Sequence, residues 1–110
     1  MEKNFRKRFL RHPDKLMFEA SVAFLAMLCR VLIETGLFGP IEISEFLRHI
    51  ARHVQTTKQP DISPGSLRAK YDKPSPVQLG LIREWLQLCL KKVDEWEERL
   101  YGKDSNQSRK

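Results

Sequence analysis

The chain has 110 residues, about the length of one folded domain, and its 41% hydrophobic content is enough to build one core. With 5 glycines, 6 prolines and 9% aromatic residues, the composition excludes the collagen-like and disordered classes. The 20 basic residues exceed the 14 acidic ones, and the resulting net charge of +6 permits a polyanionic partner without requiring one. We therefore predict a single domain over residues 1–102.

The basic N-terminus precedes an apolar stretch and so superficially resembles a signal peptide. The uncharged segment between Glu19 and Arg30 is about half of the roughly 20 residues that a membrane span needs. We therefore predict a basic arm over residues 1–12, then a buried helix, and no membrane contact. Cys29 and Cys89 lie in apolar runs, which favours core thiols over a disulfide and a reducing, cytoplasmic location.

Helical periodicity dominates the chain, and no segment alternates apolar and polar residues as an amphipathic strand does. A first helix over residues 13–35 is apolar around most of its circumference, which is typical of a central helix, and Gly36 provides its stop signal. Leu37 and Phe38 are expected to close the end of the core. A second helix over residues 44–55 has one apolar stripe.

The second half of the chain has two start signals in which a serine N-cap precedes a proline. After a polar loop at residues 56–62, they predict a short helix over 64–71 and a long helix over 76–101, which ends at Gly102. The tail at residues 103–110 contains no hydrophobic residue and is predicted to be disordered. The fold class is all-α, a single compact bundle of about four helices with long first and last helices.

The last helix has the apolar rhythm of a coiled coil. Its apolar residues are spaced alternately by 3 and 4 over three heptads: Leu79, Ile82, Leu86, Cys89, Val93, Trp96 and Leu100. If the other helices cover this stripe, Trp85 and Trp96 belong to the core. If they do not, the two tryptophans mark an interface, and the chain is a protein interaction or scaffold module that could dimerise through this helix.

A resemblance to a known family rests on the stretch from Thr57 to Tyr71, which contains Ser66-Leu67-Arg68-Ala69-Lys70 and leads into Pro74-Ser75-Pro76. With its flanking helices, this region resembles the C-terminal part of the RteC-like proteins, regulators of conjugative-transposon excision in Bacteroidetes. The resemblance implies an all-helical transcription regulator of a mobile element, with a helix-turn-helix-like part that binds DNA.

Positive charge gathers in the segment that a helix-turn-helix would use, residues 48–73, with six basic and two acidic residues. Basic side chains there would contact phosphates, and Ser66 or Arg68 would reach base edges. The candidate DNA-binding residues are Arg48, Arg52, Lys58, Ser66, Arg68, Lys70 and Lys73. The alternative is a solvated basic face of a small helical protein.

Motifs for enzyme chemistry are absent from the sequence. His49 and His53 have the spacing of a metal pair, but no glutamate of a zincin motif lies between them. The sequence has no phosphate-binding glycine loop and no nucleophile motif. We therefore predict a non-enzymatic protein with no cofactor and no metal.

Overall fold

A computed structural model describes residues 14–102 of the chain. Along this part the elements are β1 (Leu16–Phe18), α2 (Val22–Glu34), α3 (Ile43–His53), β2 (Val54–Thr56), α4 (Pro64–Asp72) and α5 (Pro76–Tyr101). Residues 14–102 are mostly helical and contain four helices, which confirms the predicted all-α class. The predicted arm at residues 1–12 and tail at 103–110 lie outside the described residues.

The start and stop signals of the last two helices act as the sequence predicts. The hydroxyl of Ser63 accepts a hydrogen bond from the backbone N–H of Ser66, and Ser75 does the same for Gln78. A proline follows each cap in the first turn, where its missing N–H costs no hydrogen bond. At the other end of α5, Gly102 adopts a φ of 58°, a conformation that favours glycine.

The predicted start of the first helix is wrong, because the helix begins at Val22 and not at residue 13. Ser21 is the N-cap, and its hydroxyl accepts the backbone N–H of Phe24 at 3.1 Å. The preceding residues of β1 pair in parallel with β2, with Leu16 opposite Val54. Backbone pairing with a strand almost forty residues away thus holds in an extended conformation a segment whose local pattern favours a helix.

The second helix also ends earlier than predicted, at His53, because Val54 turns to extended backbone and starts β2. Lys15 helps to hold this strand. Its Nζ donates to the backbone oxygens of Ala51 and Pro60, each at 3.3 Å, while the side-chain amide of Gln55 donates to the oxygen of Lys15. The short sheet therefore fastens the loop after α3 to the chain that enters α2.

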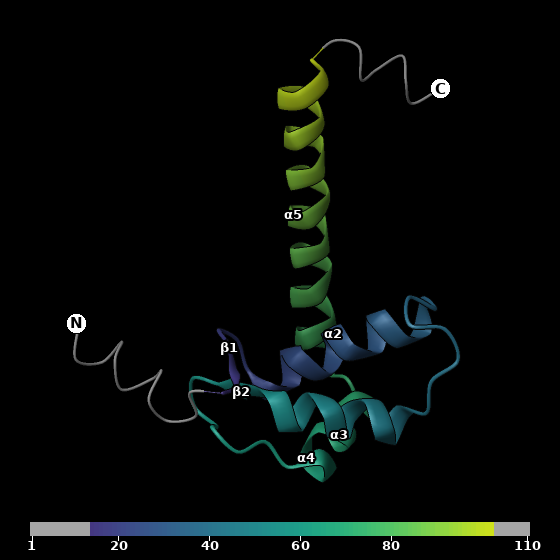
Figure 1. Cartoon of the computed structure of the whole chain (residues 1–110), viewed down its shortest axis with the longest axis vertical. Coiled ribbons are helices and arrows are strands. Elements are labelled where there is room, and N and C mark those ends of the chain that lie inside the picture. The colour runs from purple at the N-terminus through teal and green to yellow at the C-terminus, as the bar shows by residue number, and fades with distance from the viewer. Residues whose placement is uncertain (1–13, 103–110) are drawn as a thin grey trace, which may run out of the picture.

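The core lies where α2 and α3 pack against α4 (Figure 1). Its buried side chains come from α2, α3, β2, α4 and the loop before α4: Val22, Leu25, Ala26, Cys29, Phe46, Leu47, Ala51, Val54, Ile62, Leu67 and Tyr71. Phe18 of β1 is partly buried and packs against them. Leu37 is exposed, so its predicted role in closing the core is wrong. Phe38 makes a ring contact with Phe46, with the centroids 5.1 Å apart.

Helix α5 contacts the rest of the protein near its N-terminal end and then continues away from it (Figure 1). Its one buried residue is Ile82, which is 6% exposed. A helix of 26 residues is about 39 Å long at 1.5 Å per residue. Most of the length of α5 therefore lies away from the core, although one side of the helix is apolar.

Candidate protein interface

Within the apolar stripe of α5, Ile82 is buried, whereas Leu79 before it is 45% exposed and most of the residues after it are exposed as well. Leu79 and Ile82, the first two residues of the heptad series, line a hollow together with Met27 and Val31 of α2. The later residues of the series form what we call the distal seam: Leu86, Cys89, Val93, Trp96 and Leu100. Four of its five members are exposed, from 40% at Leu86 to 68% at Leu100.

Leu90 extends the distal seam on one side, whereas Leu88 and Tyr101 lie farther round the helix. Leu88, Leu90 and Tyr101 are all more than half exposed. Isolated exposed leucines are normal on protein surfaces, but a contiguous apolar strip is typical of an interaction site. The sequence left open whether the stripe of α5 is core or interface. In the described residues Ile82 is the one buried member of the stripe, and the distal seam has no covering element.

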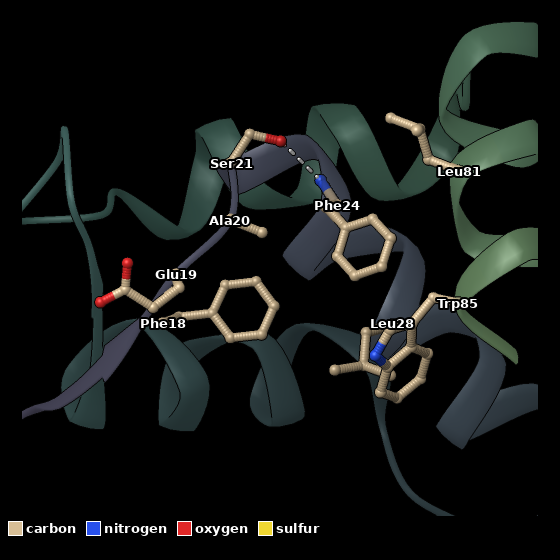
Figure 2. Close-up of a pocket in the computed structure, with 8 residues that line it drawn as sticks. All are labelled: Phe18, Glu19, Ala20, Ser21, Phe24, Leu28, Leu81 and Trp85. Carbon is tan, nitrogen blue, oxygen red and sulfur yellow. Dashed lines mark hydrogen bonds between the residues drawn. The ribbon is translucent and has the colours of Figure 1, made fainter. Parts of the chain in front are cut away.

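A second apolar feature lies at the junction of α5 with α2. A hollow of about 500 Å³, which we call the aromatic hollow, is lined by Phe18, Glu19, Ala20, Ser21, Phe24, Leu28, Leu81 and Trp85. Figure 2 shows the indole of Trp85 and the rings of Phe18 and Phe24 around it. Phe24 lies edge-on to Trp85 with the centroids 6.1 Å apart, and it stacks with Phe18 at 6.2 Å.

Sequence reasoning missed the aromatic hollow as a site. Phe18 belongs to an unpredicted strand, Phe24 to α2 and Trp85 to α5, so only the packing of three elements brings them together. The single sequence signal was the widening of the heptad stripe by Leu81 and Trp85. Of the two predicted interface residues, Trp85 lines the hollow and Trp96 lies on the exposed distal seam.

The candidate DNA-binding residues do not form one continuous surface of one helix. Arg48 and Arg52 are exposed one turn apart on α3. Lys58 and Lys70 line a second hollow, of about 440 Å³, together with Ser21, Val22 and Ala23 at the N-terminal end of α2. Two of the predicted cations thus meet beside a helix N-terminus, where the helix dipole favours an anion.

Arg68 is held by contacts inside the fold. Its Nε donates to both carboxylate oxygens of Asp72 at 3.1 Å, and its Nη1 donates to the hydroxyl of Ser44 on α3 at 2.8 Å. These bonds tie α4 to α3 and do not favour the predicted contact with base edges. Ser66 is half-buried in the first turn of α4, and Lys73 is exposed where α4 ends.

Helix α4 lacks most features of a DNA-recognition helix. It has 9 residues, and Leu67 and Tyr71 are buried in the core against α2 and α3. Its exposed positions include Gly65, Ala69 and Asp72, and Lys70 is the one exposed cation among them. A recognition helix in a major groove instead presents side chains that donate to base edges.

The described residues contain no group of three or more histidine, cysteine, aspartate or glutamate side chains that could hold a metal ion. His49 and His53 are both exposed on α3. Burial raises the pKa of the Cys29 thiol to about 12, so this thiol stays protonated and unreactive at neutral pH. Within residues 14–102, none of the helices is long and apolar enough to cross a membrane.

In comparisons with known proteins, the chain matches no family model, no curated protein and no solved structure. The geometry of residues 14–102 is therefore the basis for the functional argument.

Proposed function

We propose that this chain is a non-enzymatic protein-interaction module that associates with itself through the distal seam of α5. The observation that carries the proposal is the exposure of the seam: Val93 is 49% and Trp96 51% exposed on a helix that has already left the core. Burial of such side chains contributes about 1.5–3 kcal/mol each. A few apolar anchors dominate the affinity of most interfaces, so the exposed residues of the seam are candidate anchors.

The pattern of the seam also supports a helical partner. Alternating spacings of 3 and 4 keep the apolar residues on one side of α5 over the length of the seam, as knobs-into-holes packing requires. A helix that is exposed on all sides usually has a polar surface throughout. The opposite side of α5 follows that rule, with Glu84, Lys91 and Glu98 exposed there.

Sedimentation velocity of the full chain tests this proposal. We expect the wild type to sediment above the 13.0 kDa of the monomer at tens of micromolar protein. Val93→Asp places a charge in the seam and should give a monomer. Gln87→Asp adds the same charge outside the seam and should sediment as the wild type does. A wild-type monomer at high concentration, or equal effects of the two variants, would contradict the proposal.

A second candidate function is DNA binding, and the meeting of Lys58 and Lys70 beside the N-terminal end of α2 supports it. The resemblance to RteC-like regulators points the same way. Two lysines and a helix N-terminus would hold a phosphate without reading a base, so the geometry favours contacts to the DNA backbone. Arg48 and Arg52 would add backbone contacts of the same kind.

Fluorescence anisotropy with a mixed-sequence duplex tests this second candidate. We expect affinity to fall steeply with salt, with a slope of about 0.9 for each neutralised phosphate. The double variant Lys58→Ala/Lys70→Ala should bind more weakly and with a smaller slope. The control is Lys91→Ala/Lys92→Ala, which removes the same charge from α5. No binding at low salt, or an equal loss of affinity in both double variants, would contradict DNA binding at this hollow.

A further inference from the structure

The aromatic hollow has apolar walls that the described residues leave partly exposed. On its α5 side Trp85 is 37% and Leu81 45% exposed, and Phe18 and Phe24 are half-buried. The rings of Phe18, Phe24 and Trp85 surround one space (Figure 2), and its volume of about 500 Å³ is typical of sites that enclose a ligand. Apolar side chains placed in this space would bury the exposed faces of the rings, which is favourable.

The backbone leads from the hollow directly to residues 1–13. Phe18, the last residue of β1, is one wall of the hollow, and the described part of the chain begins four residues before it. Asp14 lies in a turn and Lys15 in a bend, so the chain changes direction directly before β1. A chain that turns back at this point runs beside β1 toward the hollow.

The chain is long enough for this path. Each residue spans at most about 3.3–3.6 Å, so Phe18 lies within about 14 Å of Asp14. The five residue steps that join Phe9 to Asp14 can span about 17 Å. Phe9 can therefore reach the hollow without any rearrangement of residues 14–102.

Residues 1–13 contain apolar side chains that suit this space. Phe5 and Phe9 are four residues apart, the spacing of one face of a helix, and Leu10 is adjacent to Phe9. Because the segment is tethered to β1, its effective concentration at the hollow is about millimolar. A modest affinity is therefore enough for this segment to occupy the hollow in preference to a free partner.

Charge distinguishes the aromatic hollow from the second hollow as a site for this segment. Residues 1–13 carry five basic side chains and one acidic one. Of the eight described residues that line the aromatic hollow, Glu19 is acidic and none is basic. The second hollow contains Lys58 and Lys70, which would repel a basic segment. The aromatic hollow is therefore the better match in charge as well as in apolar character.

We propose that residues 5–10 of the same chain occupy the aromatic hollow, with Phe9 in contact with Phe24 and Trp85. The inference goes beyond the proposed function, because it assigns an occupant to the aromatic hollow and a binding role to the predicted arm. The hollow and the distal seam are different parts of the surface, so the inference does not rest on association through α5.

Photocross-linking of the full chain tests the position of Phe9. The photoreactive residue p-benzoylphenylalanine is placed at position 9 in one variant and at position 37 in a control variant, since Leu37 is 68% exposed and follows the other end of α2. Each variant is irradiated as a dilute mixture of isotopically labelled and unlabelled chains. Mass spectrometry then identifies the cross-linked peptides and shows whether both come from the same chain.

We expect cross-links from position 9 to Phe24, Leu28 or Trp85 of the same chain, and no cross-link from position 37 to these residues. Cross-links between labelled and unlabelled chains would show that the segment enters the hollow of a second copy, which would overturn the inference for the same chain. Cross-links from position 9 only outside the hollow, no cross-link from position 9, or equal cross-linking to the hollow from both positions would also overturn it.

The fluorescence of Trp85 tests the same contact without a cross-linker. Trp96→Phe leaves Trp85 as the single tryptophan of the chain. In this background Phe9→Ala should increase the quenching of Trp85 by acrylamide, because the indole loses its cover. Lys7→Ala is the control, which removes a side chain from the same segment and should leave the quenching unchanged. Equal quenching in Phe9→Ala and in its parent would contradict the proposed contact.

Discussion

Burial separates the chemistry of the two cysteines. Cys29 is 1% exposed in the core, and burial raises the pKa of its thiol to about 12, whereas Cys89 is partly exposed on α5. We predict that a thiol reagent at pH 8 modifies Cys89 rapidly and Cys29 only after unfolding. Cys89→Ser should abolish the rapid reaction. Two rapid thiols in the native chain would contradict the burial of Cys29.

The same burial predicts how stability depends on alkaline pH. The ordinary thiol pKa is 9.0, so the unfolded chain releases the Cys29 proton above pH 9, while the folded chain keeps it until about pH 12. Burial also raises the pKa of Tyr71. The folded state thus binds more protons in this range, and the free energy of unfolding falls as pH rises above 9, by at most about 1.4 kcal/mol per pH unit for each group.

Urea denaturation at pH 8 and pH 10.5 measures this loss. We expect the wild type to lose more stability between the two pH values than Cys29→Ala does, although the variant starts from a lower stability because of its cavity. Because the cavity lowers the stability of the variant equally at both pH values, it does not affect the change in stability between them. Identical slopes in the two proteins would contradict a proton held by Cys29.

At the scale of elements, the two tryptophans of α5 should behave differently. Trp85 contacts Phe24 and lines the aromatic hollow, whereas Trp96 is 51% exposed on the distal seam. We predict that Trp96→Ala changes the stability of the monomer by less than about 1 kcal/mol but shifts the sedimentation profile toward monomer. Trp85→Ala should lower the thermal stability even in dilute protein. A large loss of monomer stability in Trp96→Ala would place that residue in a core.

The sequence predictions were accurate where an element depends on adjacent residues and inaccurate where it depends on residues far away in the sequence. Local signals placed the helix ends at Ser63, Ser75 and Gly102 correctly, because a cap or a positive φ depends on a few adjacent residues. Strand β1 was missed because three residues carry no periodicity and because its partner β2 is remote in sequence. The hydrogen bonds of Lys15 that hold the pair leave no pattern in the sequence.

The same distinction applies to the candidate site. The heptad rhythm predicted the apolar stripe of α5, because side-chain position on a helix follows directly from residue number. Which part of the stripe is buried depends on where α2 packs. The burial of Ile82 is therefore evident from the structure but not from the sequence. The bonds from Arg68 to Ser44 and Asp72 are equally invisible in a count of basic residues.

At the scale of the whole molecule, association through α5 should couple stability to protein concentration. A dimer forms from folded chains only, so mass action stabilises the folded state as concentration rises. For a domain of this size, the apparent Tm should increase by a few degrees Celsius for each tenfold increase in concentration above the dissociation constant. Differential scanning calorimetry from about 10 to 500 micromolar covers this range. The Tm of Val93→Asp should stay constant over the same range and equal that of the wild type at its lowest concentration, because Val93 lies outside the core. A wild-type Tm independent of concentration would show that the apolar seam of α5 remains uncovered in solution.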